Sequence, residues 1–467
     1  MFRKTKLIIN IIISLLVVTV GSLSLGTSIY YSKQSADINS KYAQQQKLIE
    51  EQEKQLNQQI IDNNELKAKY DELYELLYPT PVEPSTEVSS VQKLVLMIGD
   101  GMGLSHVECA ENYLAEGETL NMKELTYSGS VDTKSLTSIE NSSKPSDSSA
   151  GATALATGTR VYNGYIAMNQ DGQDLETITE IAKAQGLGVG IVTTDYLYEA
   201  TPAVFSSHTD SRTNFVDIRK DQYAGNVDLF LGSDVYLENL EADTDGFYSQ
   251  VSEIAEGQTY NSGYVYALEQ QKIIDAGYTF VTDFNYDTLN EDNLIEEDKI
   301  FGAFEEISVS KLQAPQNNSK VNKTPCLSQL TEFAIEWMEL HFPNGYFLMI
   351  EENNIDVFSE NHSTSELRYE TGDMAECLLE LDRCVGIVNN KLQTSSESYA
   401  IIVTGDHSTG SLIESTNREE NYGFWSSWHD LGDVPYFVEA PGCDLAERVD
   451  NILIFDLMKR MIVPTKQ

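Results

Sequence analysis

Basic residues are scarce in this sequence. Lys and Arg together number 31 against 73 Asp and Glu in 467 residues, which gives a formal net charge of -42 and a pI near 4.3. Proteins that bind nucleic acid displace counterions with a basic surface, so this charge balance excludes a nucleic-acid partner. It also means that any phosphate site must draw positive charge from metal ions or from a local arginine.

Cysteine is scarce too, and the five residues show no CxxC pair and no Cys/His spacing typical of zinc sites. An odd number leaves at least one thiol unpaired or paired between chains. Cys377 and Cys384 lie seven apart in a helical pattern, about 10 Å along the helix axis, too far for an unstrained disulfide. We therefore expect the cysteines to be core residues. The sequence also shows no internal repeat.

Charge is absent from Leu7 to Gly26, a mostly apolar run that follows the basic segment Met1–Lys6. The run is long enough to span a bilayer, and the positive charge before it favours a cytoplasmic N-terminus. No small-x-small motif closes the run, so we expect residues 1–31 to be a cytoplasmic tip and an uncleaved membrane anchor. The rest of the chain would then be extracytoplasmic. A cleaved signal peptide and a secreted protein are the alternative.

Proline and glycine are absent from residues 32–78, where apolar residues recur weakly every seven positions. This pattern predicts a helix that is either a coiled-coil stalk or a solvated single helix. The proline-rich residues 79–90 predict a stiff linker. We expect residues 91–467 to form the catalytic domain.

From Val91 onward, short apolar runs with the length of buried strands alternate with helical patterns. The runs are 93–99, 188–194, 346–350 and 399–404, and the helical patterns are 175–185, 329–341 and 366–392. This alternation predicts an α/β fold, a three-layer sandwich with a mostly parallel central sheet. Residues 215–322 are acidic and irregular, and we expect a loop-rich insertion around 243–260.

Polar side chains stand where several of these predicted strands end. They are Asp100, Thr193, Thr194, Glu351, Asp406 and His407. Ligands of parallel sheets bind beyond the carboxyl ends of the strands, so one edge would collect these side chains. Carboxylates with imidazoles suit zinc, and oxygen donors alone suit magnesium. The sequence therefore predicts metal sites at this edge.

A serine begins a run of small residues in the segment Lys144–Gly158. Ser148 would lie at a helix N-terminus, where unpaired N–H groups and the helix dipole favour phosphate. A serine in that position can attack phosphorus. The alternative is that Ser148 is only the N-cap of the helix.

Taken together, these motifs resemble the alkaline phosphatase family, and the likeness runs from about Val91 to the C-terminus. It includes Gly-Asp-Gly-Met-Gly at 99–103, Asp-Ser-Ser-Ala-Gly-Ala-Thr-Ala at 147–154 and His-Thr-Asp-Ser-Arg at 208–212. The resemblance implies that Ser148 is the phosphorylated nucleophile, that Arg212 binds the phosphate and that Asp147 lies beside them.

The resemblance also implies three metal sites. Asp356 and His429 would hold a first zinc; Asp406, His407 and, in the free enzyme, Ser148 a second zinc; Thr201 and Glu351 a magnesium ion; and Asp100 would bridge the second zinc and the magnesium.

One ligand position departs from the family pattern. The family has a histidine four residues after the aspartate of the first zinc site, and here that residue is Glu360. Glu360 could bind as a carboxylate, which zinc accepts; a local bulge could bring in His362; or the site could be weak. We favour Glu360. There are two further departures. Glu199 stands near the magnesium site where the family often has Asp or His, and Val357 stands near the phosphate where many members have Lys or His. Loss of that positive group could alter phosphate affinity and metal choice.

The resemblance implies hydrolysis of small phosphate monoesters through a phosphoserine, with two Zn²⁺ and one Mg²⁺, and a homodimer. The alternatives are a pseudophosphatase or phosphate-binding surface protein with a degenerate first metal site, and a phosphodiesterase of the same superfamily. A sulfatase is disfavoured because the Ser148 motif lacks the sulfatase Cys/Ser-x-Pro-x-Arg pattern. We expect structural roles for His106, His341 and His208, the last on a helical segment.

Overall fold

The computed structural model describes residues 90–233, 270–282, 294–304, 307, 325–360, 371–414, 422–443 and 445–463. Its strands are β1 Lys93–Gly99, β2 Tyr127–Asp132, β3 Gly188–Tyr196, β4 Leu229–Ser233, β5 Thr279–Val281, β6 Ile300–Phe304, β7 Tyr346–Glu352, β8 Tyr399–Gly405, β9 Ser408–Thr409, β10 Leu412–Glu414, β11 Tyr422–Phe424, β12 His429–Asp430, β13 Val434–Glu439 and β14 Arg448–Asp450. Its α-helices are α3 Leu104–Glu111, α4 Leu136–Glu140, α5 Ser148–Thr157, α6 Ile178–Ala184, α7 Ala200–Val204, α8 Phe215–Tyr223, α11 Leu327–His341, α12 Asn354–Glu360, α13 Gly372–Gln393 and α14 Asn451–Ile462, and short 3₁₀ turns cover Asn121–Glu124 and Leu294–Glu296.

Within these residues, ten strands form one sheet in the order β14-β2-β13-β8-β1-β7-β3-β4-β6-β5. Neighbouring strands are parallel except at β13, which runs antiparallel to both β8 and β2. The predicted mostly parallel α/β sheet is therefore confirmed, with one reversed strand that the sequence pattern did not reveal. The reversal leaves β1 and its neighbours with a common carboxyl edge.

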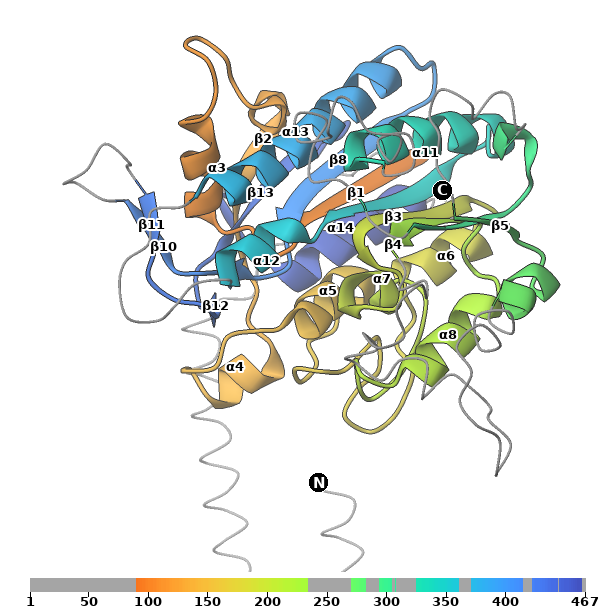
Figure 1. Ribbon diagram of the computed structural model, residues 1–467, viewed down its shortest axis with the longest axis horizontal. Coiled ribbons are helices and arrows are strands. Elements are labelled where there is room, and N and C mark those ends of the chain that lie inside the picture. The colour runs from red at the N-terminus through yellow and green to blue at the C-terminus, as the bar shows by residue number, and fades with distance from the viewer. Residues whose placement is uncertain are drawn as a thin grey trace, which may run out of the picture. The chain divides into compact units, whose positions relative to one another are not determined.

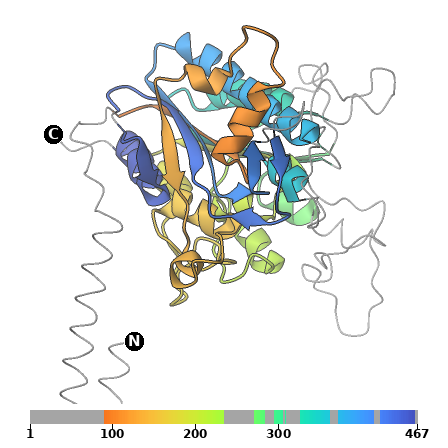
Figure 2. The same ribbon diagram turned by 90° about the vertical axis from the view of Figure 1, so that its left-hand side faces the viewer.

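Helices cover both faces of the sheet (Figure 1). Side chains alternate along a strand, so Leu94, Leu96 and Ile98 of β1 enter one apolar cluster, and Val95 and Met97 enter the other. Figure 2 shows α13 and α14 on opposite sides of the strands. Both faces of β1 are thus buried, and its end is held rigidly.

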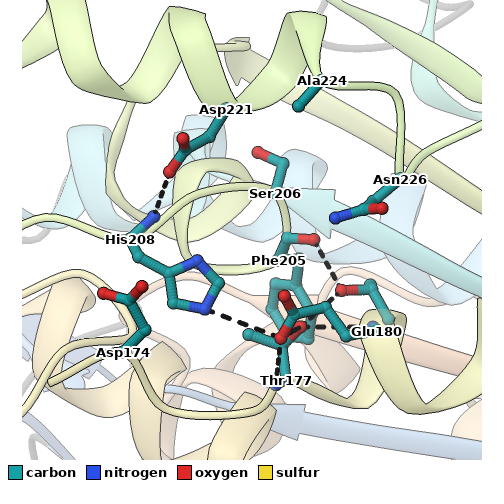
Figure 3. A pocket seen from close by; sticks show the side chains of 10 residues that line it. Asp174, Thr177, Glu180, Phe205, Ser206, His208, Asp221, Ala224 and Asn226 are labelled. Atoms are coloured by element: carbon teal, nitrogen blue, oxygen red, sulfur yellow. Dashed lines mark hydrogen bonds and ion pairs between the residues drawn. The ribbon is translucent and has the colours of Figure 1, made fainter.

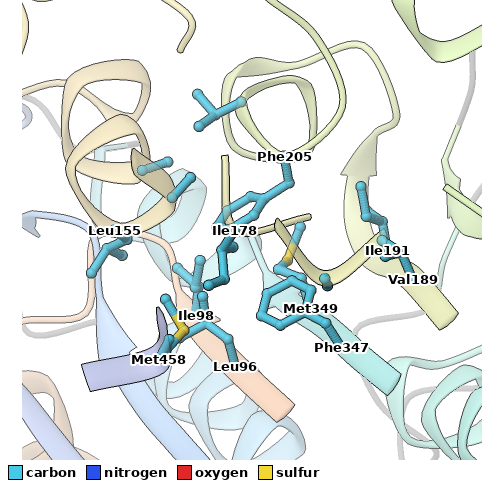
Figure 4. Packing of buried hydrophobic residues seen from close by; sticks show 14 of the residues in the cluster. Leu96, Ile98, Leu155, Ile178, Val189, Ile191, Phe205, Phe347, Met349 and Met458 are labelled. Carbon is cyan, nitrogen blue, oxygen red and sulfur yellow. The ribbon is translucent and has the colours of Figure 1, made fainter. Parts of the chain in front are cut away.

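The first cluster packs α5, α6 and α14 beneath the sheet. Leu155 of α5, Ile178 of α6 and Met458 of α14 meet the side chains of β1 there (Figure 4). The second cluster packs α11 and α13 on the other face, through residues such as Trp337 and Leu381. Burial of this much apolar surface on two faces is the main stabilising term for the platform that carries the site.

The structure corrects one expectation about chain organisation and does not test the other. The stretch 215–322 is not irregular throughout, because β4, β5 and β6 in it extend the sheet. They escaped notice because each is only three to five residues long. The predicted anchor (residues 1–31), the stalk (32–78), all but the last residue of the linker (79–90) and the insertion at 243–260 lie outside the described residues. Among the residues that are described, no helix has the length and apolarity needed to cross a membrane.

Candidate metal and phosphate site

The carboxyl ends of β1, β3, β7 and β8 bring the predicted polar residues to one edge of the sheet. Register pairs Ile98 with Glu351, and Glu351 with Thr193 on the other side. Gly99 pairs with Gly405, so the residues that follow, Asp100 and Asp406, leave the sheet side by side. Parallel pairing alone therefore gathers groups that are hundreds of residues apart in sequence.

One group of potential metal ligands consists of Asp100, Asp406 and His407, with donor atoms within 4.8 Å of one another. His407 Nε2 lies 3.2 Å from Asp100 Oδ1 and 3.5 Å from Asp406 Oδ2. All three residues are buried. The backbone N–H groups of Gly101 and His407 donate to Asp406 Oδ1, which leaves Oδ2 facing the imidazole.

A second group consists of Asp356, His407 and His429. The rings of His407 and His429 stack with centroids 3.7 Å apart, so the two groups are adjacent. His429 Nδ1 donates to the carbonyl oxygen of Ser146 at 2.8 Å, which leaves Nε2 free to bind a metal. That Nε2 lies 3.3 Å from Glu360 Oε1 and 3.9 Å from Asp356 Oδ1.

Glu360, the last residue of α12, therefore lies beside the proposed first metal position, one helical turn after Asp356. His362 falls outside the described residues, so its competing role stays a prediction.

Thr201 and Glu351 form the third set of predicted ligands. Glu351 is fully buried on β7, and Thr193 donates to its Oε2. Its other oxygen, Oε1, and the hydroxyl oxygen of Thr201 are buried without a hydrogen-bond partner. Burial raises the pKa of Glu351 well above its usual range, and the nearby Asp195 raises it further.

Ser148 is the first residue of α5. Its N-cap is Asp147, whose Oδ1 accepts from the Ala150 N–H at 3.0 Å. The interpretation of Ser148 as a mere N-cap is therefore wrong, because the preceding aspartate takes that part. Ser148 is buried, and its Oγ lies 3.1 Å from His407 Nε2. The Ser148 hydroxyl thus contacts His407, which belongs to both groups of potential metal ligands.

Arg212 approaches from the other side. Its Nη2 lies 3.2 Å from Glu199 Oε2, and its Nη1 lies 3.8 Å from Asp147 Oδ2. The backbone N–H of Arg212 donates to Gly164 O, while the Gly164 N–H donates to Asp147 Oδ2. This closed set of contacts holds the guanidinium next to the start of α5, where a bidentate group could bind two phosphate oxygens.

The donor set suits divalent cations. Carboxylates crowd together here, and one oxygen each of Asp100, Glu351 and Asp406 is buried without a hydrogen-bond partner. Burial and neighbouring Asp100 raise the pKa of Asp406 to about 7 and that of Asp356 to about 6. Burial lowers the pKa of His407, but Asp406 and Asp100 outweigh it and raise that pKa to about 10. Such a cluster needs cations, either protons or metal ions, to be stable.

The other three histidines have structural contacts. His106 accepts from the Gly103 N–H and contacts Ser359 Oγ, and burial lowers its pKa to about 4. His341 Nε2 donates to Ile295 O at 2.8 Å. His208 lies in the irregular segment between α7 and α8 rather than on the expected helix. His208 and Glu180 both line a cavity of about 160 Å³, and Figure 3 shows their side chains facing each other. The Nε2 of His208 lies 3.6 Å from Glu180 Oε2 and 3.0 Å from Leu175 O.

Sequence reasoning missed two residues of this site. Asp195 lies near the end of β3, and its pKa is raised well above the usual range by burial and by Glu199, with a further contribution from Asp100. Thr409 is buried two residues after His407 and contacts ligands of both groups. Its place only two residues after the Asp406-His407 pair was the available signal for Thr409.

Comparison with known proteins decides the family. The alkaline phosphatase family model matches residues 91–438, which is most of the chain. The chain belongs to the alkaline phosphatase family. Alkaline phosphatase 4 of Bacillus subtilis is 26% identical over 342 residues, covering 72% of this chain and 65% of that protein. Alkaline phosphatase of Escherichia coli is 28% identical over 352 residues, covering 69% of this chain and 71% of its own.

Solved alkaline phosphatases share the fold. The enzyme from the Antarctic bacterium TAB5 superposes with a TM-score of 0.61 at 21% identity, covering 80% of this chain and 98% of its own. A variant of that enzyme, with glutamate in place of a histidine, has Mg bound in its M3 site. This chain spans slightly under two thirds of the length of the B. subtilis alkaline phosphatase 4.

We expect zinc to bind the metal-free protein more tightly as pH rises from about 5 to about 8, because bound protons must leave first. The raised pKa values of Asp356 and Asp406 mean that these carboxyls hold protons at the acidic end of that range. Titration calorimetry at several pH values measures the affinity and the protons released. Asp406→Asn removes one of these protons and should flatten the rise. An affinity independent of pH in the parent would contradict the expectation.

Proposed function

We propose that this protein is a metal-dependent phosphomonoesterase that works through a phosphoserine at Ser148. The carrying observation is the 3.1 Å contact between Ser148 Oγ and His407 Nε2 at the start of α5, among carboxylates with unpaired buried oxygens. Membership of the alkaline phosphatase family supports the same reaction. The substrates are small phosphate monoesters.

We propose two zinc ions and one magnesium ion as its cofactors. Asp356, Glu360 and His429 would hold the first zinc, and Asp406, His407 and Ser148 the second. Thr201 and Glu351 would hold magnesium, with Asp100 between it and the second zinc. When bound, these ions supply the positive charge that activates the attacking oxygen and offsets the charge of the phosphate. Thr201 Oγ1 and Glu351 Oε1, buried without partners, support the third position.

The chain's own residues would carry the rest of the reaction. The Ser148 hydroxyl gives up its proton to solvent, its oxygen bonds to phosphorus in line with the ester bond, that bond breaks, and the departing alkoxide takes a proton from water and leaves as the alcohol. Arg212 binds two equatorial oxygens of the transferring group, with Asp147 fixing its direction. Water then attacks phosphorus, the bond to Ser148 breaks, the serine regains a proton, and inorganic phosphate leaves.

Glu360 is our choice for the third protein ligand of the first zinc. Its Oε1 lies 3.3 Å from His429 Nε2, and carboxylates are ordinary zinc ligands. Loss of a residue that only orients a metal ligand typically weakens metal binding by about 10–100-fold. Because Glu360 would bind the metal itself, Glu360→Ala should weaken zinc binding at this site by at least that much. Glu360→His should restore the affinity. His362→Ala is the matched control and should leave the zinc affinity unchanged. Loss of affinity in His362→Ala alone would reverse the assignment.

The expected location is extracytoplasmic, with the membrane anchor at residues 1–31 or, after cleavage, secretion. A homodimer is also part of the proposal. Partial protease digestion of intact cells and mass spectrometry of the mature N-terminus would separate the anchored from the secreted form.

The function is tested by p-nitrophenyl phosphate hydrolysis with the full chain, stripped of metal and then given zinc and magnesium. Turnover that returns with metal supports the proposal. Phosphate binding without turnover, under any metal, would instead support the pseudophosphatase. Val357, which is 38% exposed, and Glu360 are the residues that motivate that second reading. Faster cleavage of bis(p-nitrophenyl) phosphate than of the monoester would indicate a phosphodiesterase.

A further inference from the structure

Thr409 lies between the two groups of metal ligands. It is fully buried on β9, where its register partner is His429 of β12. Its backbone N–H donates to Gly101 O at 3.1 Å. Its hydroxyl contacts Asp356 of the first site and His407 of the second. One side chain therefore touches ligands of both sites.

The hydroxyl proton can go to only one of these partners. An ionised carboxylate only accepts, so the Thr409 O–H donates to Asp356 Oδ1. The hydroxyl oxygen is then left as an acceptor for His407 Nδ1, 3.2 Å away. His407 Nδ1 must carry the proton, which fixes the imidazole tautomer.

This tautomer has a consequence for the metal side of the ring. In the neutral form of the ring the single proton therefore sits on Nδ1, and Nε2 presents its lone pair to the space shared with Asp100 Oδ1, Asp406 Oδ2 and Ser148 Oγ. Those atoms lie 3.2, 3.5 and 3.1 Å from Nε2. Thr409 thus holds His407 in the form that binds a metal, and the same hydroxyl holds Asp356 in place.

We propose that Thr409 is a positioning residue that couples metal binding at the two sites. With a second-site ion bound, His407 would be held in one orientation, its Nδ1 would hold the Thr409 hydroxyl, and that hydroxyl would orient Asp356 toward the first site. Binding at one site therefore lowers the ordering cost at the other, which is positive cooperativity. The inference rests on the proposed function only in taking both groups as metal sites.

The test compares Thr409→Val with Thr409→Ser in the metal-free full chain, by calorimetric titration with zinc. The parent should take up two zinc ions cooperatively. Valine keeps the shape but has no hydroxyl, so it should weaken both sites by about 10–100-fold and abolish the cooperativity. Serine should restore both. Thr179→Val is the matched control, since Thr179 is a buried threonine whose hydroxyl donates to the Phe205 carbonyl, away from the ligands.

A spectroscopic measurement separates positioning from simple loss of stability. In the zinc-bound parent and the serine variant, the His407 Nδ1–H should give a slowly exchanging, downfield proton resonance. That resonance should be lost in the Thr409→Val variant. If Thr409→Val does not fold, Thr409→Ala takes its place in the measurement.

The possible outcomes separate the coupling from the reaction. Weakening of only one site, or cooperativity that survives in the valine variant, would overturn the coupling and leave the phosphatase proposal standing. Cooperative zinc binding without phosphate ester hydrolysis would support the coupling through Thr409 and overturn the phosphatase proposal.

Discussion

Ser148→Ala is expected to reduce turnover of p-nitrophenyl phosphate by at least about a thousand-fold, or about 4 kcal/mol in the activation barrier. The side chain is buried at the start of α5, and its Oγ is 3.1 Å from His407 Nε2. Alanine removes the only atom of the residue that can form a bond to phosphorus. Arg212 and the carboxylates remain, so phosphate should still bind.

The measurement combines steady-state kinetics with trapping of the phosphorylated protein in acid. The parent should yield phosphoserine at position 148, and the alanine variant none. Zinc titration of the same variant checks that Asp100, Asp406 and His407 still bind metal. Ser143→Ala, at an exposed position in the preceding loop, should behave as the parent. Turnover above a tenth of the parent value in Ser148→Ala would remove the serine from the reaction.

Gly151→Ala is the second substitution with a large expected effect. In most helices this change is stabilising, by about 0.8–1 kcal/mol. Here the added Cβ would overlap the backbone carbonyl oxygen of Asp406, which no side-chain rotation relieves. Because residues three apart lie on one face of a helix, Gly151 and Ser148 both face the end of β8. Relief of the overlap therefore moves Ser148, the proposed nucleophile, away from His407.

A displacement of about 1 Å at a reacting group can cost about 100-fold in rate, so we expect at least that loss of kcat in Gly151→Ala. We also expect a lower midpoint of thermal unfolding. Gly372→Ala, in the first turn of α13, is the control, since its Cβ would meet no atom closer than 3.9 Å. Unfolding curves and kinetics of both variants test this. A Gly151→Ala variant as active and as stable as Gly372→Ala would mean that α5 does not press against β8.

Much of the fold could be predicted because its strands and helices follow from local patterns of apolar and polar residues. Runs such as 93–99 are apolar on both faces, which marks buried parallel strands, and the polar residue that follows each run marks the carboxyl edge. Asp100, Glu351 and Asp406 were found this way, and the structure brings them together. The start of α5 was predictable from small residues, although which residue caps it was not.

The remaining features depend on long-range contacts. The antiparallel direction of β13 cannot be seen in its sequence, because its apolar pattern is the same in either direction. The pairing of Arg212 with Glu199, and the place of Thr409 between two sites, arise only after the strands are aligned. Glu360 itself was predicted from the family pattern, but its 3.3 Å approach to His429 Nε2 depends on the packed position of α12.

The order of strands in the sheet also constrains when the site can form during synthesis. β1 is made before the other strands but lies between β7 and β8, which leave the ribosome some 250 and 300 residues later. Until then β1 has no neighbouring strand on either side. The ligand groups near Asp100 stay incomplete until His407 and then His429 have been made. A nascent chain, made from its N-terminus, therefore cannot complete either of the two ligand groups that contain His407 until that residue has emerged. Chains truncated before His407 would lack both of these groups, so metal binding there would report a nearly complete chain.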